Sequence, residues 1–207
     1  RVDVLMDKLK LAHRAVWENL QPAPYTEVII KDNWVQLTTP GAPSAVMNGI
    51  FRCELASEVA EAKIIETIAY YRNKKLPFRW KTCESSKPDN INELLVKHGL
   101  ILKDELLGFV AAPGELQIEA NPEVEIKEVT LESKRDWLIV QASAWKASPE
   151  VIDFIDKNFE KEFEIIKKGS AKAFIAYLGA TPVASAGIVF HKDFAYFAGG
   201  ATAPSSL

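Results

Sequence analysis

The most regular pattern of apolar and polar positions lies in the C-terminal part of the chain. Residues 171–178, 183–190 and 194–198 are rich in apolar, β-prone side chains, and short turn segments separate them. This spacing is typical of an antiparallel meander. We therefore expect three successive strands, the third of which ends in a Gly-Gly loop at residues 199–204.

Two amphipathic helices are expected before this meander. Apolar residues recur at helical spacing over residues 132–145 and 149–168. Ser148 suits the N-cap of the second helix, and Pro149 suits its first position, where a missing N–H costs little. Residues 124–129 alternate between apolar and polar side chains, which predicts a preceding strand. The predicted order is a strand, two helices and three strands.

The N-terminal part of the chain alternates between predicted strands and helices. Apolar periodicity and the positions of proline and glycine set the bounds of these elements. Gly99 stands where a left-handed residue commonly ends a helix. The expected elements are a helix over residues 2–20, a hairpin over 28–38, a strand over 46–53, a helix over 58–75 capped by Ser57, a strand over 78–83, a helix over 90–98 and a strand over 100–112.

Proline and glycine also mark a boundary between the two parts. Residues 111–114 and 120–122 contain them and flank a polar stretch, which is typical of a linker. We therefore expect a first domain at residues 1–113, a linker at 114–122 and a second domain at 123–207. The expected fold class is α/β, with mixed, mostly antiparallel sheets and flanking helices.

Composition argues against several classes of function. The chain has 207 residues and a formal net charge of −3, so it offers no basic field for nucleic acid or an acidic membrane. No apolar run approaches the roughly 20 residues needed to span a bilayer. No set of His, Cys and acidic residues has the spacing of metal ligands, so we expect no metal. Cys53 and Cys83 each lie in a strand-like segment, which favours buried free thiols in a reducing, cytoplasmic compartment.

One segment resembles a known enzyme superfamily. The stretch AKAFIAYLGATPVASAGIVFHKDFAYFAGGATAPSSL, preceded by two helices, is similar to the first half of a Gcn5-related N-acetyltransferase (GNAT) domain. In that superfamily the meander leads into a loop, Arg/Gln-x-x-Gly-x-Gly/Ala, which opens a helix and holds the cofactor pyrophosphate, because helix N-termini bind anions. The resemblance implies that residues 123–207 form the first half of such a domain and end before this loop.

The N-terminal part resembles the second half of the same fold. Residues 76–113, LPFRWKTCESSKPDNINELLVKHGLILKDELLGFVAAP, are similar to a segment of the first repeat of tandem GNAT proteins. The pyrophosphate loop would fall at residues 54–58, which contain no glycine and two carboxylates that repel a phosphate. We therefore expect a degenerate first repeat that does not hold coenzyme A in the usual way.

The resemblance implies an N-acetyltransferase that moves an acetyl group from acetyl-CoA to a small-molecule or peptide amine. In GNAT enzymes the amine attacks the thioester directly, and backbone N–H groups of a splayed strand polarise the carbonyl and pair with the pantetheine arm. By resemblance, these amides belong to a strand end and turn formed by Ala198, Gly199, Gly200, Ala201 and Thr202.

Candidate catalytic side chains near this strand are few. In the superfamily, the general base is often an acid on this or a neighbouring strand. His191, Asp193 and Tyr196 are the nearby side chains with suitable chemistry, and each also suits a turn or a strand surface. By the same resemblance, Trp145 and Lys146, in the link between the two helices, line the groove for the amine.

A second hypothesis is a non-catalytic binding or interaction protein with the GNAT fold and no functional site for coenzyme A. It is motivated by the lack of a pyrophosphate loop in either half of the sequence. In this case the first repeat could complete the open sheet of the second and cover its edge at residues 194–198. A homodimer also stays open. Binding of acetyl-CoA separates the two hypotheses.

Overall fold

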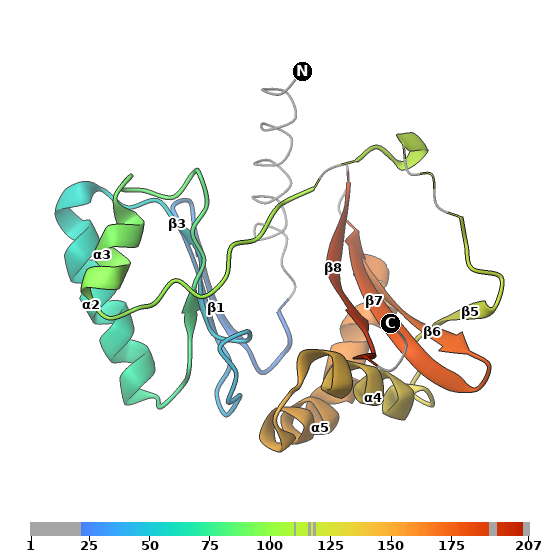
Figure 1. Ribbon diagram of the computed structural model, residues 1–207. Coiled ribbons are helices and arrows are strands. Elements are labelled where there is room, and N and C mark those ends of the chain that lie inside the picture. The colour runs from blue at the N-terminus through green and yellow to red at the C-terminus, as the bar shows by residue number, and fades with distance from the viewer. Residues whose placement is uncertain (1–21, 110, 116, 118, 191–193, 205–207) are drawn as a thin grey trace. The chain divides into compact units, whose positions relative to one another are not determined.

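The computed structural model describes residues 22–109, 111–115, 117, 119–190 and 194–204, and all structural statements refer to them (Figure 1). The chain divides into two compact units, Arg1–Val110 and Ala111–Leu207. Each unit contains a four-stranded sheet. The helix predicted over residues 2–20 lies outside the described residues.

The N-terminal unit contains a mixed sheet in the order β1-β2-β3-β4. β1 (Glu27–Lys31), β2 (Trp34–Thr38) and β3 (Gly49–Cys53) are antiparallel, which confirms the predicted hairpin. β4 (Arg79–Trp80) pairs with β3 in parallel. Parallel pairing requires a crossover between the two strands, and here α2 provides it.

Two helices lie on the same side of this sheet (Figure 1). They are α2 (Ser57–Asn73) and α3 (Ile91–Lys97), and Gly99 follows α3 with the predicted left-handed conformation, at φ 90°. Tyr71 of α2 is fully buried, and its hydroxyl donates to the carbonyl oxygen of Leu37 at 2.6 Å. The buried core of this unit consists of Trp34, Ile50, Cys53, Ile64, Tyr71, Ile91 and Leu95.

Three predicted boundaries in this unit are wrong. Ala56, not Ser57, is the N-cap of α2, because the extended backbone of Ala56 already turns the chain into the helix. The strand predicted over residues 46–53 begins only at Gly49. The strand predicted over residues 78–83 is limited to two residues, since the chain leaves β3 after Lys81 and returns to it at Lys87.

The strand predicted over residues 100–112 does not form among the residues described there. Most of its apolar side chains are exposed, with Phe109 87% and Ile101 84% exposed, whereas Leu100 packs against the core of this unit. A strand needs a neighbouring strand for its backbone hydrogen bonds, and no described strand pairs with this segment. An apolar, β-prone pattern alone cannot supply that partner.

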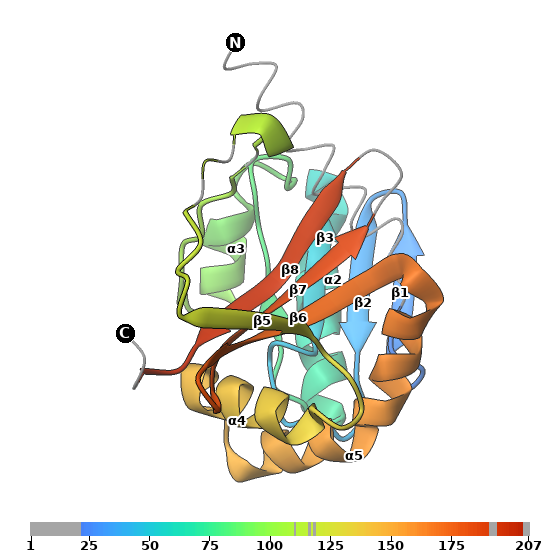
Figure 2. The ribbon, with the colours of Figure 1, turned by 90° about the vertical axis from the view of Figure 1, so that its right-hand side faces the viewer.

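The C-terminal unit contains an entirely antiparallel sheet in the order β5-β6-β7-β8, which Figure 2 shows with its strands side by side. The predicted strand, two helices and meander are confirmed here. The elements are β5 (Val124–Glu128), α4 (Lys134–Trp145), α5 (Pro149–Ile165), β6 (Ala171–Leu178), β7 (Thr181–Phe190) and β8 (Ala195–Thr202).

In this unit α4 packs against β7 and β8, and apolar side chains of α5 pack against those of β6. Ser148 occupies the N-cap of α5 and Pro149 its first position, as predicted. After α5 comes a π-helical turn, Ile166–Ser170. It contains Gly169, whose left-handed backbone, at φ 80°, directs the chain into β6. The buried core consists of Val129, Phe159, Phe163, Ala173, Ile175 and Tyr177.

The third strand of the meander is longer than predicted. We expected a strand over residues 194–198 followed by a loop, whereas β8 continues through both glycines to Thr202. Gly199 pairs with Gly187 and Gly200 with Ala186 of β7. The ladder therefore overrides the low strand propensity of glycine.

Candidate functional site

The predicted cofactor-binding residues all lie on β8, an edge strand. Within the described residues, β8 pairs with β7 alone. Gly187 of β7 is opposite Gly199, and the next residue, Ile188, is opposite Phe197. Ala198 is therefore an extra residue in β8 and forms a β-bulge, which bends the strand and interrupts its ladder. The predicted strand end and turn is in fact a bulged strand.

Alternation along β8 fixes the direction of its backbone groups. The N–H of Ala203, just after the strand, donates to the carbonyl oxygen of Val183 at 2.8 Å. In an antiparallel pair, residues that face the partner strand alternate with residues that face away. The backbone N–H and C=O groups of Ala201 therefore point toward β7, and the N–H groups of Gly200 and Thr202 point to the open edge. No described strand pairs with this edge, so these two donors can meet an extended ligand.

The side chains around the bulge leave part of this edge open. A Cβ atom at Gly199 would meet no atom within 4 Å. A Cβ atom at Gly200 would lie 3.0 Å from the Cε1 atom of Phe197. The Phe197 ring thus lies beside the backbone of Gly200 and is itself 61% exposed. Ala201 is buried, and Thr202 is exposed.

Two side-chain hydrogen bonds attach α4 to the sheet. Gln141 Nε2 donates to the Oγ of Ser185 at 2.8 Å, and Ser185 is the ladder partner of Ala201. Tyr177 of β6 donates its hydroxyl proton to Asp136 Oδ2, also at 2.8 Å. Burial and the adjacent Asp136 carboxylate raise the pKa of Tyr177. Tyr177 is therefore protonated at neutral pH and acts as a hydrogen-bond donor.

Gln141 also shows how far the residues predicted to line the acceptor groove lie from the strand next to β8. Trp145 follows Gln141 by four residues, so the two side chains share one face of α4, about 6 Å apart. Trp145 is 62% exposed at the end of the helix. Lys146 follows as the left-handed C-cap, at φ 48°, and is exposed. The last turn of α4 thus carries an exposed indole one turn beyond the contact with Ser185.

The structure places one of the three predicted catalytic side chains. Tyr196 lies on β8 opposite Val189 and is 38% exposed. No hydrogen bond to its hydroxyl is found within the described part of the chain, so no described group activates it. His191 and Asp193 lie outside the described residues. The role of all three residues stays a prediction.

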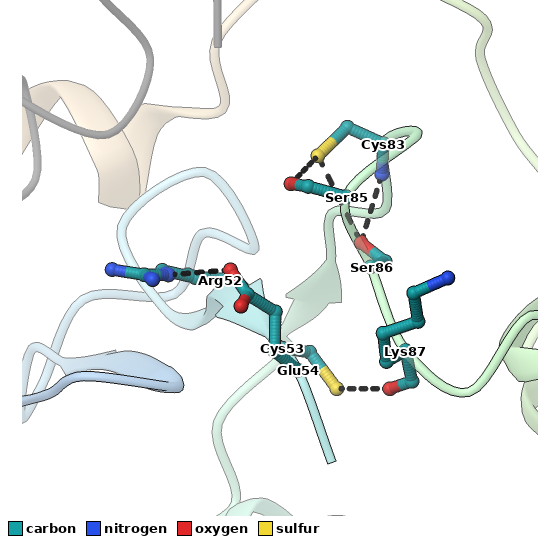
Figure 3. A network of polar contacts seen from close by, with 7 residues as sticks. All are labelled: Arg52, Cys53, Glu54, Cys83, Ser85, Ser86 and Lys87. Atoms are coloured by element: carbon teal, nitrogen blue, oxygen red, sulfur yellow. Dashed lines mark hydrogen bonds and ion pairs between the residues drawn. The ribbon is translucent and has the colours of Figure 1, made fainter. Parts of the chain in front are cut away.

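The segment that precedes α2 in the N-terminal unit has a different arrangement, and Figure 3 shows Arg52, Glu54 and Lys87 from it and its neighbour. Arg52 Nε donates to Glu54 Oε1 at 2.9 Å. Leu55 N–H donates to the carbonyl oxygen of Lys87 at 3.1 Å, and Lys87 N–H donates to that of Cys53 at 3.0 Å. The backbone leading into α2 is therefore engaged by the returning chain. Together with the Glu54 carboxylate, this geometry is unfavourable for a phosphate.

The two thiols have opposite environments. Cys53 is buried, and burial raises the pKa of its thiol to about 12. Cys83 is exposed, contrary to the prediction, because β4 ends at Trp80 and Cys83 lies in the turn that follows. Its N–H donates to Ser86 Oγ at 3.0 Å (Figure 3). Both cysteines are free.

Sequence reasoning missed the contacts that shape these surfaces. Gln141 and Ser185 are 44 residues apart, and no local pattern relates them. Lys81 was also missed: burial, and then the charge of Arg79, lower its pKa to about 8. The alternation Arg79-Trp80-Lys81 indicates that both cations share a face, and each lies 5.2 Å from the ring centroid of Phe51. The burial of that face has no local signal.

Neither a metal cluster nor a membrane-crossing helix is found in the described part of the chain. No group of three or more His, Cys, Asp and Glu side chains there could hold a metal ion. No helix in the same part of the chain is long and apolar enough to cross a membrane.

The fold is similar to solved structures. One is a GCN5-related N-acetyltransferase from Kribbella flavida. The match covers 98% of this chain and 74% of the Kribbella flavida chain, with 14% sequence identity and a TM-score of 0.63. Another is a conserved protein of unknown function from Staphylococcus epidermidis ATCC 12228. The match covers 94% of this chain and 77% of that protein's chain, with 12% sequence identity and a TM-score of 0.55. The first of these likenesses shows that the chain shares the mixed α/β fold of the Kribbella flavida acetyltransferase.

A further likeness is partial. The PaiA N-acetyltransferase from Thermoplasma acidophilum, solved in complex with coenzyme A, matches 40% of this chain, with 18% identity and a TM-score of 0.33. The chain spans 60% of the length of that protein. No protein-family description and no curated protein matches the sequence.

Proposed function

We propose that the protein is an N-acetyltransferase that moves an acetyl group from acetyl-CoA to an amine. The observation that carries the proposal is the edge strand β8, with its bulge at Ala198 and the outward N–H groups of Gly200 and Thr202. The likeness of the fold to the Kribbella flavida enzyme supports it. The proposal concerns the C-terminal unit.

The open edge of β8 suits the pantetheine arm of acetyl-CoA. This arm is an extended chain with two amides, so it can add to a sheet edge as a peptide strand does. Gly200 and Thr202 would donate to it, and Gly199 leaves room beside the backbone. We place the acetyl group at the bulge, where the interrupted ladder of Ala198 frees backbone groups that can polarise a carbonyl.

The reaction needs no covalent enzyme intermediate. Acetyl-CoA, when bound, supplies the thioester, and the amine nitrogen forms a bond to its carbonyl carbon as the C–S bond breaks. The products are an amide and the free thiol, which takes up the proton that the amine loses. His191, Asp193 and Tyr196 remain our candidates for the proton transfer.

The acceptor is a small-molecule or peptide amine in this proposal. Trp145 offers an exposed apolar surface one helical turn from the Gln141–Ser185 contact, and Lys146 lies beside it. We expect Trp145 to contact the carbon skeleton of the acceptor. Two free cysteines favour a reducing compartment, so we place the reaction in the cytoplasm.

The test is acetylation of defined amines, followed by mass spectrometry of the products. The protein is incubated with acetyl-CoA and, separately, with a polyamine, an aromatic amine and a lysine peptide. We expect an acetylated product from at least one class, and loss of that product with Gly200→Val, whose side chain crowds the Phe197 ring at the proposed site. Gly114→Val is the matched control, because open space surrounds Gly114.

The non-catalytic alternative has its own observation in the N-terminal unit. The backbone before α2 is engaged by Lys87, so a phosphate site there is not favoured. If no amine is acetylated and acetyl-CoA does not bind, the alternative holds and the proposal is wrong. Binding without turnover would retain the β8 site and leave only the acceptor class to be found.

A further inference from the structure

A small cavity opens in the N-terminal unit, and none of the residues that line it belongs to the proposed acetyl-CoA site. It measures about 200 Å³ and lies between the β1–β2 hairpin and α2. Pairing of Lys31 with Trp34 and of Ile29 with Gln36 places these four side chains on the face of the sheet that carries the cavity. Leu55, just before α2, completes its apolar wall.

Buried polar side chains form the floor of this cavity. Trp34 is 4% and Gln36 is 7% exposed, and both line the cavity. Trp34 Nε1 donates to Gln36 Oε1 at 3.1 Å, which fixes both side chains. The edge ring contact between Trp34 and Trp80, at 5.5 Å, holds the indole from another side. The floor is therefore preorganised.

Backbone hydrogen bonds hold the walls in place. The carbonyl oxygen of Asn33, at the hairpin tip, accepts from Glu54 N–H at 2.9 Å. The N–H of Leu55 donates to the carbonyl oxygen of Lys87 at 3.1 Å. The hairpin tip and the segment before α2 are thus fastened to neighbouring chain segments, so the cavity belongs to the framework of the unit.

The charge that lines the cavity is positive, although the chain as a whole is acidic. Its lining includes Lys31 and Lys63 and no carboxylate. Lys63 Nζ lies 5.4 Å from the centroid of the Trp34 ring and also pairs with Glu66 at 2.9 Å. Lys31 has no ion pair within the described part of the chain. Two lysine side chains therefore border a cavity that has apolar walls and a polar floor.

We propose that this cavity binds a small organic carboxylate with one ring or a branched apolar group. The carboxylate would pair with Lys31 and Lys63, and the apolar part would lie against Trp34, Ile29 and Leu55. The size is suitable, since a cavity of about 150 Å³ holds benzene. The apolar walls distinguish such a ligand from a simple inorganic anion.

The test uses benzoate as the probe and the full chain labelled with ¹⁵N. Benzoate should shift the indole N–H signal of Trp34 and the amide signal of Lys63 in a saturable way. Benzyl alcohol, which has the same ring and no charge, should bind at least fivefold more weakly. Inorganic phosphate should not shift the indole signal.

Two variants separate charge from folding. Lys31→Met and Lys63→Met keep most of the side-chain length and remove one cation each, so each should weaken benzoate about tenfold. Lys97→Met is the control, because Lys97 also pairs with a glutamate, Glu61, and lies outside the cavity. Equal binding of benzyl alcohol, equal binding by all variants, or no shift with benzoate would each overturn the proposal.

Discussion

Gln141 of α4 donates a hydrogen bond to the Ser185 hydroxyl over 2.8 Å, and this contact joins the helix to the strand beside β8. Ser185 is 5% exposed and is the ladder partner of Ala201. The last turn of α4, with Trp145, therefore has a fixed position relative to the proposed edge site. This relationship leads to the first prediction.

Ser185→Ala should destabilise the protein by about 1–3 kcal/mol, because the Gln141 amide loses its partner in a largely buried place. Urea unfolding followed by circular dichroism measures the change. Combining the variant with Gln141→Leu should recover part of the loss, since no polar group is then left unpaired. A Ser185→Ala protein as stable as the wild type would contradict the contact.

The thiols should differ in reactivity toward iodoacetamide. At pH 8 the folded protein should react rapidly at Cys83 and very slowly at Cys53, because burial shields Cys53 and raises its pKa to about 12. Peptide mass spectrometry after a time course distinguishes the two sites. Cys83→Ser should remove the rapid phase, and urea should expose the second thiol. Rapid native labelling of Cys53 would contradict its burial.

Lys81 should make stability depend on pH. Its folded pKa is about 8, lowered from 10.5 mainly by burial, so between these values the unfolded chain binds more protons than the folded one. The free energy of unfolding therefore increases as pH rises from about 8 to about 10.5, because Lys81 loses its proton more easily in the folded protein. Below pH 8 this increase is absent.

The measurement compares wild type with Lys81→Met at pH 7 and pH 10. Relative to the variant, the wild type should gain about 1–2 kcal/mol over this range, after allowance for the partial exposure of the side chain. Comparing the two proteins cancels the titration of Cys53, which has the opposite sign. Lys75→Met, at an exposed lysine, should show no such difference. Parallel pH profiles for Lys81→Met and wild type would refute the assignment.

Gly49→Ala should be strongly destabilising. A Cβ atom at this position would lie 1.9 Å from the carbonyl oxygen of Arg79, and the φ of Gly49, 142°, is one that other residues rarely adopt. Backbone atoms cannot yield as a flexible side chain can, so β3 and β4 would separate. We expect a loss of more than about 3 kcal/mol by thermal unfolding. Gly114→Ala is the control, and equal stability of both variants would be inconsistent with the parallel pairing.

Local patterns were sufficient for much of the fold. The β1–β2 hairpin, both helices of the C-terminal unit and the meander each follow from periodicity and turn residues within one segment. The position of Ser148 before Pro149 also located the start of α5. These features depend on neighbours in the sequence, so the sequence contains their signal.

Features that depend on distant partners could not be predicted. Residues 100–112 have the composition of a strand and no described strand to pair with. Gly199 and Gly200 were expected to end a strand, whereas the ladder with β7 carries it through them. The bulge at Ala198 and the Gln141–Ser185 contact likewise arise from register and packing. The predicted cofactor-binding residues therefore form a bulged edge strand instead of the expected strand end and turn, and their binding role stays a prediction.

The most direct measurement is a calorimetric titration of acetyl-CoA into the wild type, Thr202→Pro and Thr202→Val. The N–H of Thr202 points away from β7, so proline there removes an outward donor and leaves the ladder intact. Valine keeps the donor and is the matched control. We expect equal affinities for wild type and Thr202→Val and an affinity about fivefold to tenfold weaker for Thr202→Pro. Equal binding by all three proteins, or no binding by any of them, would contradict the β8 edge as the site of acetyl-CoA.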